Sequence, residues 1–326
     1  MFDIYFEPNY GKLYEKVEDG ESVVFEHRSS LGKIRHMFIK RKIPITIDNE
    51  IYYDIVTPYG YGGPLVVEGN DMDALVKEFE KEFHKYCEEN NIVSEFVRFH
   101  PIDKNHINFN AVYETTYLRK TVGTNLSFDD PFLEEFSKST RKAIRRVLQE
   151  DVEYQIIESP TDISSFMNVY YSTMDRNEAS DYYYFDKEYF ESCMEDFKNQ
   201  IIIVNVLYEN KVIASSFNFL SNDRLHVHLS GTLTEYIKHS PAYIIKYATM
   251  KWAKDHGFSL IHYGGGTSND VDDNLFKFKK KFGKSTEFDF YIGKRIWNQE
   301  IYDLLCETKK VDKDSKFFPA YRKSNI

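Results

Sequence analysis

The chain has 326 residues, which at roughly 150 residues per domain predicts two domains. Hydrophobic residues make up 42% and charged residues 29% of it, which excludes a disordered protein, and no apolar run approaches the ~20 residues of a membrane-spanning helix. Acidic residues number 52 and basic residues 42, and the net charge of −10 disfavours a protein that coats nucleic acid. Any bound anion must therefore meet a local basic patch.

The N-terminal segment and the cysteines indicate the compartment. Residues 1–21 lack a basic start followed by an apolar block, so we expect no signal peptide. The three cysteines, Cys87, Cys193 and Cys306, lie far apart and make neither a metal-type pair nor a disulfide framework. Both observations predict a cytoplasmic protein.

Strand-like and helix-like segments alternate along the chain, which predicts an α/β fold. In the first half we expect strands at Ser22–His27, His36–Lys40, Ile51–Val56, Ser94–His100 and Asn110–Arg119. An amphipathic helix begins at a cap, Asp71 or Asp73. Its apolar stripe consists of Leu75, Phe79, Phe83 and Tyr86.

The segment TPYGYGGPL (Thr57–Leu65) predicts a tight loop, because three of its nine residues are glycine and two are proline. A purely structural turn would need positive φ at glycine. A functional loop would form a cleft wall, with Tyr59 and Tyr61 contacting a ligand through their rings and hydroxyls. The sequence leaves both interpretations open.

The segment KSTRKAIRR (Lys138–Arg146) has five basic residues in nine and no acid, inside a predicted helix from Thr140 to Gln149. Arg141 and Arg145 are four residues apart and share one helix face. This face is either solvated or directed at phosphate groups, whose oxygens match arginine geometry. We expect a domain boundary just after it, near Asp151–Tyr154, which gives domains 1–150 and 151–326.

The second half begins with predicted helices at Ile163–Met174 and Tyr189–Lys198. A hairpin follows, with its turn at Glu209–Asn210, and then a strand at Arg224–Gly231. A helix opens at Ser240–Pro241 and closes at Gly257, and the strand after it runs into Gly264–Gly266. From Gln200 onward the order is therefore β-β-β-α-β-α, which is compatible with an acyltransferase-like fold.

Arg176 is a single arginine in the polar stretch YSTMDRNEASDYYYF (Tyr171–Phe185). It follows a predicted helix. At this position it would either bind an anion or cap the helix.

The segment Gly264–Lys284 predicts a helix with acids at its start and lysines at its end, an order that the helix dipole favours. At 100° per residue, its apolar face carries Leu275, Phe278 and Phe282. Lys277 and Lys281 lie opposite and face water. Lys279 borders the apolar face, so it either packs its stem on the core or directs a cation into a cleft, where it would stabilise an oxyanion or a phosphate.

Several motifs are missing from the sequence. His226 and His228 alternate on a strand with no third ligand apparent, so we expect no metal site. The nucleophile elbow, the Walker loop, the dinucleotide fingerprint and the zinc-protease motif do not occur. The glycine signature of acetyl-CoA acetyltransferases is missing too, since TEYIKHSPAY (Thr234–Tyr243) stands before the central helix.

Four blocks together resemble the FemABX-type family of peptidoglycan-bridge aminoacyltransferases. They are TPYGYGGPL, STRKAIRR, YYSTMDRNEASDYYYF, and SPAYIIKYATMKWAKDHG with the HYGGG and LFKFKKKFG that follow it. The resemblance implies an α/β fold of two tandem GNAT-like (acyl-CoA N-acyltransferase-like) domains, with mixed sheets flanked by helices. It also implies that the tail 300–326 packs back on the first domain.

By this resemblance, the protein moves an aminoacyl group from aminoacyl-tRNA to an amine of a nucleotide-linked or lipid-linked peptidoglycan precursor, without a cofactor. The family's Phe-Lys-x-x-Phe-Gly motif is Phe278 to Gly283 here, so Lys279 inherits the place near the donor's terminal phosphate and the developing oxyanion. Phe278 and Gly265 join it as substrate-binding residues. Arg176, together with Lys40 or Arg41, would lie near the acceptor's diphosphate.

Two departures from the family bear on the donor. The chain lacks the long helical hairpin of some members, and its acidic charge leaves little surface for the body of a tRNA. One alternative is an acyl-CoA-dependent N-acyltransferase acting on an amino sugar or a surface-polysaccharide precursor. Another is a non-catalytic binder of nucleotide-linked precursors or RNA ends. The sequence does not fix the oligomeric state.

Overall fold

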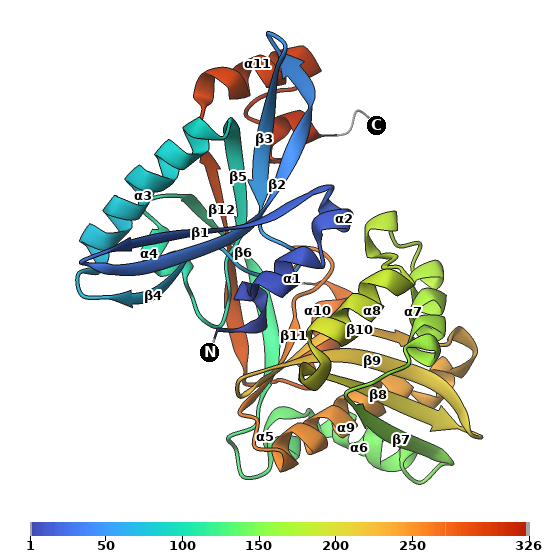
Figure 1. Cartoon of the computed structure of the whole chain (residues 1–326). Coiled ribbons are helices and arrows are strands. Elements are labelled where there is room, and N and C mark those ends of the chain that lie inside the picture. The colour runs from blue at the N-terminus through green and yellow to red at the C-terminus, as the bar shows by residue number, and fades with distance from the viewer. Residues whose placement is uncertain (1, 271, 324–326) are drawn as a thin grey trace. The chain divides into compact units, whose positions relative to one another are not determined.

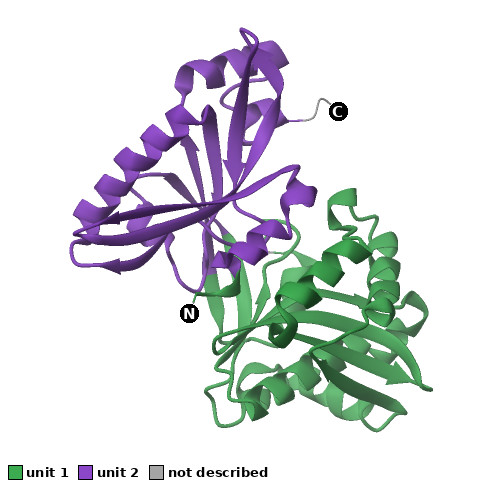
Figure 2. Ribbon diagram, in the orientation of Figure 1, with its two compact units in different colours: residues 1–4, 119–288 green, residues 5–118, 289–326 purple. Residues whose placement is uncertain are grey.

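The computed structural model describes residues 2–270 and 272–323. The chain divides into two compact units (Figure 2): unit 1 consists of Met1–Ile4 and Arg119–Phe288, and unit 2 of Tyr5–Leu118 and Asp289–Ile326. The chain passes from one unit to the other within strand β6 (Glu114–Asn125) and again within strand β12 (Glu287–Ile296). This division differs from the boundary that we predicted after residue 150.

The predicted boundary fails because the basic helix belongs to unit 1. Helix α6 (Lys138–Val147) places Ile144 and Val147 in one buried cluster with Ile244 and Ile245. The region Asp151–Tyr154 is not a linker, since strand β7 (Val152–Glu158) begins there. The charged surface of α6 resembles a linker in the sequence, whereas its apolar side packs in the core.

Unit 2 is built on a mixed sheet whose strands follow the order β1-β2-β3-β5-β12, with β4 paired to β2. Strands β3 and β5 are parallel, and β1 and β2 form an antiparallel hairpin. The strands are β1 (Gly20–Ser29), β2 (Gly32–Ile47), β3 (Glu50–Val56), β4 (Leu65–Gly69) and β5 (Ile92–Arg98). The strand predicted at Asn110–Arg119 begins later, at Glu114, because its first residues form a turn.

The helices of unit 2 are α1 (Pro8–Lys12), α2 (Glu15–Glu18), α3 (Met72–Glu89), α4 (His106–Phe109) and α11 (Gln299–Lys309), with 3₁₀ helix η5 (Ala320–Arg322) and, where the chain enters the unit, η1 (Ile4–Phe6). Helix α3 confirms the predicted amphipathic helix. Asp71 is its cap and accepts a hydrogen bond from the Ala74 N–H at 3.1 Å. Leu75, Phe79 and Phe83 are fully buried, and each such side chain stabilises the fold by about 1.5–3 kcal/mol.

The C-terminal segment completes the core of unit 2. Tyr302 and Leu305 of α11, together with Tyr321, pack in one cluster with Ile43 of β2 and Val93 of β5. The core of this unit therefore joins residues from both ends of the chain.

The strands of unit 1 follow the order β6-β11-β10-β9-β8-β7. Strands β10 and β11 are parallel, and the other neighbours with assigned register are antiparallel. Its further strands are β8 (Ile201–Tyr208), β9 (Lys211–Ser221), β10 (Arg224–Thr232) and β11 (Leu260–Gly264).

The helices of unit 1 cover both faces of its sheet, with α7 and α8 on one face and α6 and α9 on the other (Figure 1). They are α5 (Pro131–Glu135), α6, α7 (Ser164–Arg176), α8 (Lys187–Asp196), α9 (Pro241–Asp255) and α10 (Asn274–Lys280), with 3₁₀ helices η2 (Asp181–Tyr183), η3 (Lys198–Gln200) and η4 (Thr234–His239). The order β8-β9-β10-α9-β11-α10 confirms the predicted β-β-β-α-β-α pattern.

Candidate active site

The glycine turn after β11 is fixed by one carboxylate, Asp273. Its oxygens accept hydrogen bonds from the N–H groups of Thr267 (3.1 Å) and Ser268 (2.9 Å), and it caps α10 by accepting from Phe276 N–H (2.8 Å). A Cβ at Gly266 would lie 2.3 Å from Asp273 Oδ1, so only glycine allows this approach. Burial raises the pKa of Asp273, but these hydrogen bonds outweigh it and the pKa falls well below its ordinary value.

Lys279 lies on α10 against this turn. Its Nζ donates a hydrogen bond to the Gly265 carbonyl at 2.6 Å, and the side chain is half-buried. Burial, and next the charge of Arg119, lower the pKa of Lys279 to about 8, while Asp273 opposes the shift. The ammonium therefore remains mostly protonated at pH 7, and it retains two further N–H donors.

The aromatic residues of the motif hold α10 in place. Phe278 is half-buried, with its ring centroid 5.6 Å from Tyr243 and 5.1 Å from Phe282. Lys277 and Lys281 are exposed, as the helical wheel predicts. Leu275 departs from that prediction: it is 38% exposed, and the next residue, Phe276, packs against the core cluster instead.

Two basic residues beside Lys279 escaped the sequence analysis. Arg119 of β6 donates from one guanidinium nitrogen to the carbonyls of Gly266 (2.7 Å) and Ser268 (3.1 Å). Lys246 of α9 is only 5% exposed, and its Nζ lies 4.4 Å from the centroid of the Tyr263 ring. The sequence feature that could have identified Lys246 is its place among the apolar residues of α9.

One arginine of the basic helix α6 donates its hydrogen bonds to the backbone. Arg141 donates to the Leu133 carbonyl at 2.9 Å, so it anchors the preceding helix α5. Arg145 is exposed and lies over the ring of Phe132, 5.6 Å from its centroid. Of the two, Arg145 is the exposed residue.

Arg176 stands at the end of α7 in unit 1. Its guanidinium donates to the Thr232 carbonyl (2.7 Å) and to the Thr234 hydroxyl (3.1 Å). The arginine thus ties α7 to the end of β10, although it remains exposed.

The remaining candidates, Tyr59, Tyr61 and Lys40, belong to unit 2. Gly60 and Gly63 of their loop adopt φ of +92° and +88°, as the turn interpretation requires. Tyr61 is 8% exposed and packs edge-on against Tyr5 at 5.2 Å, whereas Tyr59 is half-buried. Lys40 donates to Asn90 at 3.3 Å and lies 4.3 Å from the centroid of the Tyr53 ring.

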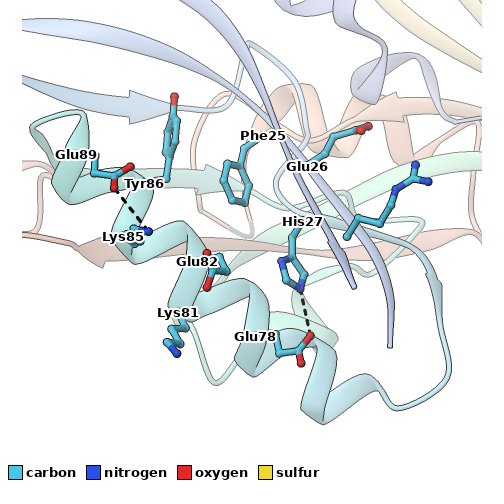
Figure 3. A pocket seen from close by; sticks show the side chains of 10 residues that line it. Phe25, Glu26, His27, Glu78, Lys81, Glu82, Lys85, Tyr86 and Glu89 are labelled. Carbon is cyan, nitrogen blue, oxygen red and sulfur yellow. Dashed lines mark ion pairs between the residues drawn. The ribbon is translucent and has the colours of Figure 1, made fainter. Parts of the chain in front are cut away.

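A cavity of about 570 Å³ lies in unit 2, between β1 and α3 (Figure 3). Its walls mix both signs of charge over the rings of Phe25 and Tyr86, and they include the ion pairs His27–Glu78 (3.4 Å) and Lys85–Glu89 (3.8 Å). None of the candidate residues lines it. We therefore centre the candidate site on Lys279.

Comparisons with known proteins identify the fold. A family profile described as an acetyltransferase (GNAT) domain matches residues 134–280, the range that contains α9, the glycine turn and Lys279. Among solved structures, the chain is similar to FemX with a TM-score of 0.70 at 13% identity, covering 93% of this chain and 94% of that chain. It is also similar to the tandem GNAT protein from the clavulanic acid biosynthesis pathway, with a TM-score of 0.52 at 8% identity over 82% and 81% of the two chains.

The class that these matches define is the tandem GNAT fold, as predicted for the α/β chain. Within it, the chain has the FemX-like (FemABX) arrangement. It is 23% identical over 178 residues to UDP-N-acetylmuramoylpentapeptide-lysine N(6)-alanyltransferase of Weissella viridescens. This match covers 54% of the chain and 52% of that protein, so the chain spans about half the length of its curated relative.

One further observation concerns membranes. Within residues 2–270 and 272–323, every helix is too short or too polar to cross a bilayer.

Proposed function

We propose that this protein is a FemX-like aminoacyltransferase, which moves an aminoacyl group from aminoacyl-tRNA to the lysine side-chain amine of a peptidoglycan precursor. The name of the Weissella viridescens relative specifies an alanyl donor group, a lysine N6 acceptor and a UDP-linked muramoyl pentapeptide. The observation that carries the proposal is Lys279, a half-buried cation aimed at the glycine turn of a FemX-like fold.

The reaction forms an amide and breaks an ester. The acceptor nitrogen attacks the ester carbonyl carbon, and the carbonyl oxygen becomes an oxyanion in the tetrahedral intermediate. When the intermediate collapses, the C–O bond to the ribose breaks, and the ribose hydroxyl leaves with the proton that the amine gives up. The Lys279 ammonium stabilises the oxyanion with the donors that Gly265 leaves unused.

The other candidates have supporting roles in this proposal. Phe278 and Gly265 shape the donor end of the site, one as an aromatic wall and the other through its carbonyl. Arg145 offers an exposed guanidinium for phosphate, and Arg141 sets the position of the helix that carries it. We assign Arg176 of unit 1 to binding of the acceptor's diphosphate. Lys40, Tyr59 and Tyr61 of unit 2 remain predictions of the sequence analysis.

Substitution of Lys279 tests the proposal. We expect Lys279→Ala to lower turnover by ~10² to 10³-fold, because a single oxyanion donor contributes that much. Lys277→Ala is the matched control: this exposed lysine of the same helix pairs with Asp272 at 2.7 Å, and its loss leaves turnover unchanged. The assay follows the aminoacylated precursor by mass spectrometry. Wild-type turnover in folded Lys279→Ala would remove the proposed role.

The GNAT profile match keeps acyl-CoA as a second candidate donor. The same assay with acetyl-CoA and an amino sugar distinguishes the two donors, since only one set yields product. We place the reaction in the cytoplasm, because all three cysteines are buried free thiols and suit a reducing compartment.

A further inference from the structure

Lys246 is a buried lysine on a helix that otherwise places its charges outside the core. Its neighbours Ile245 and Ala248 belong to the core cluster of unit 1, and Lys246 itself is 5% exposed. Lys251, five residues further along α9, is exposed. Lysine is almost never buried to this degree without a partner, so the position needs an explanation.

The Lys246 amine has no such partner in the described parts of the chain. Across residues 2–270 and 272–323 it makes no hydrogen bond and no ion pair, and its single polar contact is the face of the Tyr263 ring at 4.4 Å. Lys254 of the same helix shows the usual solution: its Nζ donates to the carbonyls of Leu126 (2.8 Å) and Phe128 (2.9 Å). Lys246 thus has its donors unused.

The surroundings of Lys246 are cationic. Burial, and then the charge of Lys279, lower the pKa of Lys246 to about 7. The charge of Arg119 lowers the pKa of Lys279, and that of Asp273 raises it. Asp273 already accepts hydrogen bonds from the glycine turn and from the start of α10. The hydroxyl of Tyr263 is bonded to Thr124 at 2.6 Å. The charge that acts on Lys246 is therefore cationic, and the carboxylate that acts on its neighbour Lys279 is already engaged in hydrogen bonds.

We propose that Lys246 is a second binding residue of the donor site: together with Lys279 it binds a phosphate group of the acyl donor, and it takes up a proton as that group binds. This inference rests on the proposed function for the identity of the donor. An anion between the two lysines supplies the missing counter-charge and favours the protonated amine. Without the anion, burial and the charge of Lys279 favour the neutral amine, so about half of the Lys246 side chains are unprotonated at pH 7.

The proposal predicts that anion affinity depends on pH. If the anion binds only when Lys246 is protonated, affinity falls by about tenfold from pH 6 to pH 8, and binding at pH 7 takes up roughly half a proton. The dinucleotide CpA is a suitable probe, because its phosphodiester keeps one negative charge over this range. Inorganic pyrophosphate is the corresponding probe for a coenzyme A donor.

The experiment is isothermal titration calorimetry in two buffers of different ionisation enthalpy, at pH 6, 7 and 8. In the wild type we expect CpA binding with proton uptake and the tenfold loss. Lys246→Met should bind CpA more weakly, with little proton uptake and only the roughly twofold pH dependence that Lys279 leaves, and Lys246→Arg should restore binding with the same shallow pH dependence. Lys251→Met, an exposed lysine of the same helix, serves as the control and should behave as the wild type.

The outcomes separate this inference from the proposed function. Equal CpA affinity in the wild type and a folded Lys246→Met, the absence of proton uptake, or no binding of either probe would overturn the inference. Binding of pyrophosphate alone, with uptake through Lys246, supports the lysine site and contradicts an RNA donor. Binding through Lys246 without aminoacyl transfer contradicts the function and leaves the anion site standing.

Discussion

Each unit buries an ionisable side chain, and the two side chains differ in their hydrogen-bond partners. In unit 2 the Glu95 carboxylate is 1% exposed and accepts hydrogen bonds from His36 Nε2 (2.5 Å), Tyr113 OH (3.1 Å) and Trp297 Nε1 (3.0 Å). In unit 1 the Lys246 side chain is 5% exposed, and among the described residues its amine meets only a ring face and the neighbouring charge of Lys279.

The difference indicates which buried charge serves the fold and which serves a ligand. A buried network whose hydrogen-bond donors and acceptors are all paired has none left to bind a substrate. Removing its acceptor leaves buried donors without partners. An unsatisfied amine costs stability, and a fold retains it when a bound group can supply the partner. The substitutions below test this distinction, from the largest expected effect to the smallest.

The largest effect is expected at Glu95. Glu95→Gln should lower the free energy of unfolding by about 3 kcal/mol, because the amide replaces one acceptor oxygen with a donor that faces two of the three donors. Urea denaturation measures the change. Glu89→Gln is the control: Glu89 forms an exposed pair with Lys85 at 3.8 Å, and its loss should not be measurable. A loss below about 1 kcal/mol at Glu95 would contradict a structural network.

These two regions differ in how far the sequence predicts them. Lys279 could be placed from the helical wheel and the family motif, and the structure puts it half-buried at the turn. Lys246 could not be placed with the same reasoning, because the buried residues of α9 surround the helix rather than form one stripe. The available signal was its place among the apolar residues of this helix.

The division into units was the main error of the sequence analysis, and its cause is long-range pairing. Local patterns located helix α3 and the β8–β9 hairpin correctly, because their contacts are close in sequence. The pairing of β12 with β5 joins Ile292 to Arg98, and that of β11 with β6 joins Ile261 to Thr124. No pattern within a single strand specifies such partners.

A smaller effect is expected at Asp273. Its carboxylate has hydrogen-bond partners, although it lies in the same unit as Lys246, whose amine has none among the described residues. Asp273→Ala should cost about 2 kcal/mol, since it removes the cap of α10 and leaves the N–H groups of Thr267 and Ser268 without their acceptor. Urea denaturation again gives the value. Asp272→Ala removes an exposed neighbouring carboxylate and should leave stability unchanged. If both variants unfold alike, Asp273 does not hold the turn.

The smallest effect is expected at Lys246. Its substitution should raise the free energy of unfolding, whereas substitution of Glu95 should lower it. The folded chain holds the pKa of Lys246 at about 7 against an ordinary 10.5, so the unfolded chain binds more protons between these values. The contribution of Lys246 to stability therefore rises from pH 7 towards pH 10.5, and it is lost as pH falls to 7.

Lys246→Met should consequently be more stable than the wild type at pH 7, by about 1 kcal/mol or more, and this advantage should shrink by about 1 kcal/mol per pH unit towards pH 9. Urea denaturation curves of the two proteins at each pH measure this difference. A destabilised Lys246→Met at pH 7, as at Glu95, would show that the amine supports the fold and that the contrast between the two units does not hold.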